Sequence, residues 1–373
     1  MKHIYSLLIS MLLISCSTSQ SKVDHIEFGD NDVSQLRDSF EYKIIPLETT
    51  DDALIRNIGE VVICGDTVFV LDVIQGKIFA FNLQGHFIKQ LGQKGEGPKG
   101  YVSPNSISLT PGKDKIMITD ISQQAILNYD RHSLEFMDKI SVPFNFRNSK
   151  PLSDSTYIFF SKVGYPREEP ETYFITTDLG FNVLKKGCKS EFFSGYGYGF
   201  HSYFYQYNDS VYLYPPYEGR IYNVSDSEFE LAWDFSFQTA DFPTISYLKS
   251  NSNKENFITN LFNSDYITDC KIEETNRILF IQYIHNGKLF LGFYDKKNKL
   301  NYTCTLSELI EILDLQSMVG ICGSTDEYLI SAFNPVGLSD RLERVQGKGR
   351  AFNTGSDDIV DESNPNLILF KLK

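Results

Sequence analysis

A turn residue recurs at a constant interval through much of this chain. Asn82 follows a short apolar run, and Asp130, Asp178 and Asp226 each lie 48 residues after the one before. A weaker copy follows at Asp295, 69 residues further on, so about twenty residues are inserted ahead of it. A repeat of this length indicates that the chain is built from similar units that stack on one another.

The stretch from residue 66 to residue 101 shows what is repeated. Three short runs of alternating apolar residues, 68–71, 77–81 and 87–91, are separated by polar turns. Such runs predict an antiparallel meander, and one such unit cannot bury its apolar faces alone. With a last partial copy from 328 to 372, six units can be counted. We therefore predict an all-β fold, a six-bladed β-propeller of four-stranded antiparallel blades.

The two ends of the repeated region each contain a run that has no partner nearby in the sequence. Residues 40–48 read as one strand, and residues 364–373 read as another. If the N- and C-terminal strands pair with each other, the last blade is built from both chain ends and the ring is closed. Closure removes exposed sheet edges and holds the termini. We therefore assign residues 40–373 to a single propeller domain.

The N-terminus carries an export signal rather than part of the fold. Lys2 and His3 precede an apolar run, 4–14, which is too short for a comfortable membrane span. Leu13-Ile14-Ser15-Cys16 resembles a bacterial lipobox, in which the peptide is cut before the cysteine and the thiol is acylated. We predict a lipoprotein signal peptide at 1–15 and a lipidated Cys16 with a polar tether over 16–39. The alternative is an ordinary signal peptide with an accidental cysteine.

Charge and cysteine content exclude some classes of function. The chain has 48 acidic and 35 basic residues, a net charge of −13, which argues against nucleic acid or an anionic membrane surface as a partner. Apart from Cys16 there are five cysteines without a C-x-x-C pair, so metal spacing is absent. We expect most of them to be small buried residues, with one disulfide as the alternative, and we expect no cofactor and no metal.

Several motifs together resemble a known family. They are Ile45-Pro46-Leu47-Glu48-Thr49, the turn from Asn82 to Phe87, the loop from Gly92 to Pro98 ahead of Tyr101, and Asn364-Pro365 before the terminal strand. This order resembles the six-bladed β-propeller lipoproteins of anaerobic Gram-negative bacteria, distant relatives of NHL-repeat propellers. Members more often carry an acidic residue just before the aromatic of the loop, where this chain has Lys99-Gly100. A shared fold does not fix the function.

The resemblance implies a place in the cell envelope. It implies a protein anchored in the outer membrane by its lipid. Acidic residues directly after the cysteine direct some related lipoproteins to the cell surface, and they are absent after Cys16. We therefore predict that the protein faces the periplasm.

An aromatic segment from residue 195 to residue 207 is the candidate ligand site. Its rings could form a stacking platform for a sugar or another flat apolar ligand. The alternation of Tyr203, Tyr205 and Tyr207 fits packing between blades equally well. The candidate ligand-binding residues are Tyr196, Tyr198, His201, Tyr203 and Arg220.

Catalysis has little support in the sequence. The histidines are scattered, and the adjacent carboxylates lie in polar loops, so we assign no catalytic residue. The glycine-rich loop 92–101 lacks the Gly-Lys-Ser/Thr ending of a nucleotide loop and should instead lead from one blade to the next. We predict a monomeric, lipid-anchored envelope propeller that acts as a binding or interaction module for a protein, glycan or peptide. The alternative is a lyase or hydrolase with its site at the mouth of the central channel.

Overall fold

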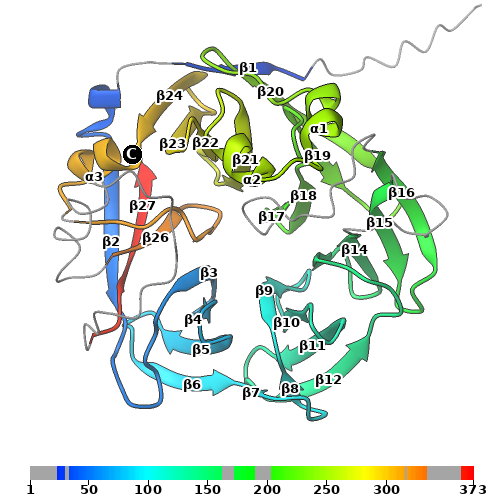
Figure 1. Ribbon diagram of the computed structural model, residues 1–373. Helices are drawn as coiled ribbons and strands as arrows, with labels where there is room; N and C mark the ends of the chain where they lie inside the picture. The colour runs from blue at the N-terminus through cyan, green and yellow to red at the C-terminus, as the bar shows by residue number, and fades with distance from the viewer. Residues whose placement is uncertain (1–22, 30–32, 162–171, 190–202, 316, 334–362) are drawn as a thin grey trace, which may run out of the picture.

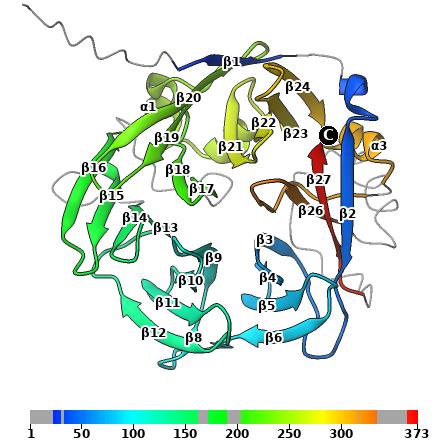
Figure 2. The same ribbon diagram turned by 180° about the vertical axis from the view of Figure 1, so that it is seen from behind.

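The computed structural model describes residues 23–29, 33–161, 172–189, 203–315, 317–333 and 363–373. Six sheets, five with four strands and one with a fifth strand added, are arranged as blades around a central channel, as Figure 1 shows from one side and Figure 2 from the other. In each blade the chain begins at the channel and proceeds outward, so the first strand is the innermost. The six-bladed propeller predicted from the repeat is confirmed.

The first three blades follow one another along the chain. Blade 1 comprises β3 (Ile58–Cys64), β4 (Thr67–Asp72), β5 (Lys77–Asn82) and β6 (Phe87–Leu91). Blade 2 comprises β9 (Pro104–Leu109), β10 (Lys115–Asp120), β11 (Ala125–Asp130) and β12 (Phe136–Ser141). Blade 3 comprises β13 (Asn148–Pro151), β14 (Thr156–Phe160), β15 (Thr172–Asp178) and β16 (Val183–Lys189).

The last three blades include the insertion and both chain ends. Blade 4 comprises β17 (Phe204–Tyr207), β18 (Ser210–Leu213), β19 (Arg220–Val224) and β20 (Phe229–Phe237). Blade 5 comprises β21 (Ile267–Glu274), β22 (Ile278–His285), β23 (Lys288–Asp295) and β24 (Leu300–Thr305). Blade 6 comprises β25 (Gly323–Ser324), β26 (Leu329–Phe333), β27 (Asn366–Leu372) and β2 (Phe40–Pro46).

The repeated turn residues lie at or just after the end of the third strand in blades 1 to 5. The side chain of Asn82 accepts hydrogen bonds from two backbone N–H groups of its turn, and Asp130, Asp178 and Asp295 do the same or accept one such bond. An Asn or Asp that bonds its own turn in this way fixes the reversal of the chain. Asp226 differs, because it accepts a hydrogen bond from the hydroxyl of Thr156 in blade 3. The first strand of blade 1, β3, precedes the three runs recognised in the sequence.

Both chain ends build blade 6, as predicted. β2 and β27 pair antiparallel over seven residues, from Phe40 opposite Leu372 to Pro46 opposite Asn366. Asn364 reinforces the junction: its Oδ1 accepts from the backbone N–H of Ile55 at 2.7 Å, and its Nδ2 donates to the carbonyl of Glu48 at 2.7 Å. These hydrogen bonds of Asn364 explain why the motif at residues 45–49 and the motif Asn364-Pro365, at opposite ends of the sequence, occur in the same protein.

The structure differs from the predicted tether over 16–39. Within that range β1 (His25–Phe28) adds a fifth, parallel strand to the edge of blade 4, and η1 (Val33–Leu36) follows it. Ile26 and Phe28 are buried against the core of blades 4 and 5. The alternation in β1 covers only four residues, and its partner strand β20 lies some two hundred residues away. This is why the sequence did not reveal it.

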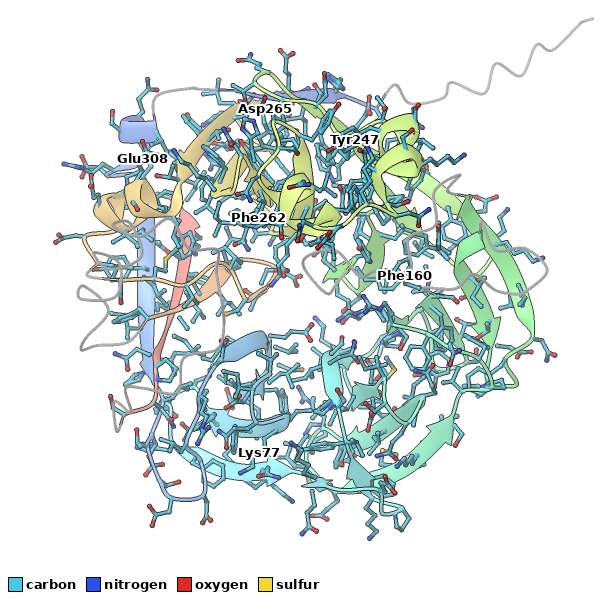
Figure 3. All side chains as sticks on the ribbon, viewed as in Figure 1. Lys77, Phe160, Tyr247, Phe262, Asp265 and Glu308 are labelled. Carbon is cyan, nitrogen blue, oxygen red and sulfur yellow. The ribbon has the colours of Figure 1, made fainter. Side chains whose placement is uncertain are left out.

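Apolar side chains fill the space between neighbouring blades. Figure 3 draws the side chains of the described residues on the ribbon. The described residues form six large buried clusters, and each cluster joins one pair of neighbouring blades. A seventh, small cluster lies beneath α1 (Ile245–Asn251) and α2 (Phe257–Phe262), the helices of the insertion before blade 5. α3 (Leu306–Ile312) follows blade 5 and packs into the cluster between blades 5 and 6. Each blade is therefore stabilised by both of its neighbours.

The predicted passage between blades 1 and 2 is confirmed. The short parallel pair β7 (Gln93–Lys94) and β8 (Gly100–Tyr101) shapes the loop between the outermost strand of blade 1 and the innermost strand of blade 2. Tyr101 is fully buried, and its hydroxyl donates to the carbonyl of Leu91 at 2.8 Å. A Cβ at Gly92 would collide with Tyr101 and Tyr129, so the loop needs a glycine there.

Two further observations bear on the sequence predictions. Four of the cysteines, Cys64, Cys270, Cys304 and Cys322, are buried and free, as expected of small core residues. No described helix combines the length and apolar character needed to cross a membrane. Cys16 and the predicted signal peptide lie outside the described residues.

Candidate functional site

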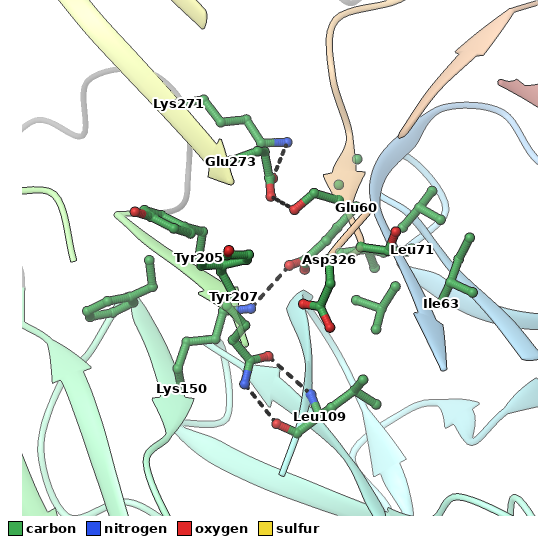
Figure 4. Close-up of a pocket in the computed structure, with 18 of the residues that line it drawn as sticks. Glu60, Ile63, Leu71, Leu109, Lys150, Tyr205, Tyr207, Lys271, Glu273 and Asp326 are labelled. Atoms are coloured by element: carbon green, nitrogen blue, oxygen red, sulfur yellow. Dashed lines mark hydrogen bonds and ion pairs between the residues drawn. The ribbon is translucent and has the colours of Figure 1, made fainter. Parts of the chain in front are cut away.

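The first strands of the six blades enclose a cavity of about 590 Å³ in the central channel (Figure 4). Its volume lies in the range of ligand sites, which are commonly about 300–1,000 Å³. Every blade contributes at least one polar side chain to the lining. These side chains include Glu60, Asn105, Lys150, Gln206, Lys271, Glu273 and Ser324. Their positions follow from the strand period of two, which turns alternate residues of each first strand toward the axis.

A buried ion pair joins blades 1 and 3 across the first strand of blade 2. The side chain of Lys150 is only 5% exposed, and its Nζ lies 3.2 Å from Oε1 of Glu60. The same ammonium donates to the Ser106 hydroxyl at 3.3 Å and to the Ile107 carbonyl at 3.0 Å. The second oxygen of Glu60 accepts from the Ile107 N–H at 2.7 Å. Both charges are therefore held by several partners.

A second pair lies on β21 of blade 5. Nζ of Lys271 is 3.7 Å from Oε1 of Glu273 and donates to the carbonyl of Ile321 at 2.7 Å. The Ser324 hydroxyl donates to Oε2 of Glu273 at 2.8 Å. Burial raises the pKa of the Glu273 carboxyl above its usual value, while Lys271 and the Ser324 hydrogen bond oppose the rise and the nearby Glu60 adds to it. A carboxyl with a perturbed pKa inside a cavity is typical of functional sites.

Contacts across the channel narrow one of its ends. The side chain of Gln206 in blade 4 makes two hydrogen bonds with the backbone of Leu109 in blade 2, at 2.9 and 3.3 Å. Just beyond the ends of these first strands, the carboxylate of Asp209 lies 3.2 Å from Nζ of Lys113. Asp326 of blade 6 accepts from the backbone N–H of Asn208 at 3.2 Å. Because these contacts link blades that are not neighbours, we infer that a ligand would enter from the opposite end, where the first strands begin.

Asn105 lies at the open end, at the beginning of β9. Its Nδ2 donates to the carbonyl of Arg147 at 2.7 Å, which fixes which end of the amide carries the oxygen. Within the described part of the chain, the buried Oδ1 has no hydrogen-bond partner. Asp269, at the beginning of β21, also lines the cavity.

The ligand-binding candidates of the sequence fall elsewhere or outside the described residues. Tyr196, Tyr198 and His201 lie outside the described residues. Tyr203 packs between blades 3 and 4, where its ring centroid is 4.6 Å from that of Phe160, labelled in Figure 3. Arg220 is exposed at the start of β19, the third strand of blade 4. Neither Tyr203 nor Arg220 lines the cavity.

The charged residues of the channel were not recognised in the sequence. The only available signal was a charged residue inside a short strand, such as Glu60 within Ile58–Cys64 or Lys271 within Ile267–Glu274. Such residues usually face solvent on a half-buried strand. Whether such a side chain faces solvent or the channel depends on the register of the first strand that carries it. The repeat in the sequence did not specify that register.

These features define a class of protein: a closed six-bladed propeller whose central cavity is lined by both charged and apolar side chains. The sequence model of the DUF5128 family, described as a 6-bladed beta-propeller, matches residues 15–332, and the chain belongs to this family. No protein with a curated description matches the sequence significantly.

Two solved structures from Bacteroides are similar to this chain. One is a Bacteroides fragilis protein described as exported; it is 29% identical with a TM-score of 0.81, and the match covers 94% of this chain and 100% of that one. The other is a member of the DUF4221 family from Bacteroides vulgatus; it is 12% identical with a TM-score of 0.56, and the match covers 90% of this chain and 99% of that one. The second likeness supports the fold alone.

Proposed function

We propose that this protein is a lipid-anchored binding module of the cell envelope, and that its ligand occupies the central cavity. The observation that supports this most is the presence of two Lys–Glu pairs, at most 22% exposed, in a cavity that is narrowed at one end. Buried ion pairs often stabilise a fold no better than apolar residues of similar volume. Their presence in the channel therefore favours a role in recognition.

The cellular location of the protein is part of the same proposal. The similarity to a Bacteroides fragilis protein described as exported supports export. The lipobox-like Leu13-Ile14-Ser15-Cys16 supports acylation of Cys16 at the outer membrane, and the absence of acidic residues directly after Cys16 supports a periplasmic orientation. The kinship with NHL-repeat propellers stays a prediction. Metabolic labelling with a clickable fatty acid tests the anchor: Cys16→Ser should abolish the label, and a retained label would contradict it.

A ligand screen on the soluble chain 17–373 tests the cavity. A ligand that binds only the folded state raises the melting temperature by mass action. Amino acids, short peptides, sugars, nucleotides and organic amines are screened at millimolar concentration, and each hit is repeated with Lys271→Met and Tyr203→Ala. We expect a hit that is lost in Lys271→Met and retained in Tyr203→Ala.

The reverse pattern would assign binding to the aromatic segment around Tyr203 and overturn the cavity as the site. If no compound of any class shifts the melting temperature, a small-ligand function is contradicted. A protein partner, sought by pull-down with the lipidated protein, would then become the leading alternative.

One observation favours a hydrolase or lyase as the second candidate. The raised pKa of Glu273 beside the lysine-paired Glu60 gives two carboxyl groups whose environments differ, which suits a general acid and a base. For a given hit, Glu273→Gln should then abolish turnover while binding persists. Unchanged recovery of the compound after incubation with the unmodified protein would overturn the enzyme candidate.

A further inference from the structure

The three lysine side chains that line the cavity differ in how far their N–H donors are already used. An ammonium group has three such donors. The ammonium of Lys150 donates to three acceptors at 3.0, 3.2 and 3.3 Å, so it has none left for a ligand. Lys113 lies beyond the ends of the first strands, where it is paired with Asp209. The third lysine, Lys271, differs from both.

The ammonium of Lys271 is only partly used. It donates to the carbonyl of Ile321 at 2.7 Å, whereas Oε1 of Glu273 lies 3.7 Å away, which is too far for a hydrogen bond. Among the described residues, no second acceptor lies within hydrogen-bond distance of this ammonium. The Lys271 side chain is 14% exposed and lines the cavity, and Figure 4 shows its ammonium beside Glu273. Lys271 can therefore donate hydrogen bonds to a ligand.

Glu273 is placed to supply a second donor beside this ammonium. Its Oε2 accepts a hydrogen bond from the Ser324 hydroxyl at 2.8 Å, so Oε1, on the side of Lys271, is the oxygen left to carry a proton. Burial is the main cause that raises the pKa of this carboxyl, and a protonated carboxyl has one O–H donor. An ammonium and an O–H that lie side by side match the two oxygens of a carboxylate.

The excess of acidic groups in the cavity does not exclude an anion at this point. Three of the five carboxylates lie toward the ends of the channel: Asp209, Asp269 and Asp326. Beside Lys271 the charges balance, because Lys271 and Lys150 stand against Glu273 and Glu60. A proton on Glu273 leaves one positive charge in surplus there, and this favours an anion with a single charge.

Resting on the proposed function, we propose that the cavity binds a carboxylate group between Lys271 and Glu273, and that Glu273 takes up a proton from solvent as the carboxylate enters. The proton binds Oε1 of Glu273, and no other bond is made or broken. The carboxylate can belong to a free carboxylic acid or to the C-terminus of a peptide, because the recognised chemistry is the same.

Calorimetric titration of the chain 17–373 tests the proposal with four probes. They are pentanoate, N-acetyl-alanyl-alanine with a free C-terminus, pentylamine and inorganic phosphate. We expect one or both carboxylates to bind, and pentylamine and phosphate not to bind. Binding of pentanoate alone identifies a free acid as the source, binding of the peptide alone identifies a C-terminus, and binding of both identifies the carboxylate group itself as what is recognised.

The affinity for the carboxylate should depend on pH in a defined direction. The groups that face Glu273 are Lys271, Ser324, Glu60 and Lys150. A bound carboxylate makes the charged form of Glu273 less favourable, so the complex holds the proton more tightly than the free protein does. The affinity should therefore fall as the pH rises, by up to about tenfold per pH unit for one proton. Titrations from pH 5.5 to pH 8.5, where both carboxylate probes are ionised, measure this slope.

Variants locate the site. Lys271→Met should weaken carboxylate binding at least tenfold, while Lys185→Met, at an exposed position on the outermost strand of blade 3, should not change it. Glu273→Gln should still bind, because an amide N–H also donates, but its affinity should no longer change with pH. Circular dichroism and melting temperatures confirm that each variant is folded. If Lys271→Met is unfolded, the pH profile of Glu273→Gln carries the test alone.

Some outcomes would overturn this inference and leave the proposed function standing. If pentylamine or phosphate binds and the binding is lost in Lys271→Met, the cavity is a ligand site but the carboxylate class is overturned. The class also falls if the wider screen yields a cavity hit and neither carboxylate binds. Carboxylate binding that persists in Lys271→Met would overturn the assignment to this lysine.

The proton step and the proposed function have tests of their own. An affinity that does not change with pH in the unmodified protein, or that changes equally in Glu273→Gln, would overturn the uptake of a proton by Glu273. If no compound binds in either experiment, the proposed function falls together with the inference.

Discussion

Carboxylates in two regions of the protein are held by different kinds of partner. At the turns after the second strands, Asp72 and Asp120 lie 48 residues apart and are fully buried. Asp120 accepts hydrogen bonds from the backbone N–H groups of residues 102, 103, 122 and 123, and Asp72 accepts from those of residues 56, 74 and 75. In the channel, Glu60 and Glu273 are instead paired with lysine side chains.

This difference distinguishes carboxylates that maintain the fold, which we call the framework, from carboxylates that are candidates for ligand recognition. A carboxylate that accepts several backbone N–H groups fixes the path of the chain, and it recurs because the turn recurs. The channel charges do not recur: the residue 48 positions after Glu60 is Ser108. Ion pairs between side chains can often be replaced together by apolar residues of similar volume at little cost in stability. We infer that the repeated acids maintain the blades, whereas the unrepeated ones are available for recognition.

The largest expected effect comes from breaking the framework. Asp120→Ala leaves four backbone N–H groups near blade 2 without their acceptor, and we expect it to lower the free energy of unfolding by about 3 kcal/mol. Urea unfolding followed by fluorescence measures this. Asp154→Ala, at an exposed turn of blade 3, is the matched control and should change stability by less than about 0.5 kcal/mol. A loss below about 1 kcal/mol in Asp120→Ala would remove the distinction drawn between the two regions.

A smaller effect is expected from the channel pair of blades 1 and 3. Lys150→Met leaves the Glu60 charge in the channel with only the Ile107 N–H. Because the Glu60 side chain is 22% exposed, we expect a loss of about 2 kcal/mol, below the roughly 3–5 kcal/mol for a fully buried pair. The double variant Glu60→Gln/Lys150→Met should recover more than half of that loss, because neither charge then remains unpaired. The same urea titration measures both variants. Glu60→Gln alone is measured in the same way. If the loss in the double variant equals the sum of the losses in Lys150→Met and Glu60→Gln, the pair belongs to the framework.

The smallest expected effect is the pH dependence contributed by Glu273. Burial raises its pKa in the folded protein above the value in the unfolded chain, so the folded state binds its proton more tightly. Its contribution to stability is therefore greatest below the unfolded pKa and decreases as the pH rises toward the folded pKa. The groups that face this carboxyl are Lys271, Ser324, Glu60 and Lys150. Glu273→Gln removes the decrease.

Melting temperatures of the variant and the unmodified protein, measured from pH 4 to pH 8, test this. The melting temperature of the variant minus that of the unmodified protein should increase with pH. The weakened contact with Lys271 would lower the melting temperature of Glu273→Gln by the same amount at every pH and would not change this trend. Thr325 also lines the cavity, directly after β25, and has no titrating group, so Thr325→Val is the control and its difference should be independent of pH. A flat difference for Glu273→Gln would show that its carboxyl titrates alike in both states.

The sequence determined the blades, their number and the closure of the ring. These features depend on turn residues such as Asn82 and Asp130 and on strands whose partners lie within one unit, so a 48-residue period displays them directly. The pairing of residues 40–46 with 366–372 followed as well, because two strands without local partners had one remaining solution. The parallel strand β1 was not predicted in this way, because blade 4 was already complete with four strands and gave no reason to expect a fifth.

Only the tertiary structure decided what fills the channel. Glu60 and Lys150 are 90 residues apart and belong to blades that are not neighbours. A shift of one residue in the register of either first strand would turn its charged side chain away from the axis. The meeting of Glu60 and Lys150 therefore depends on the registers of two first strands and on the placement of their blades around the ring. The periodic pattern of a single unit does not specify either.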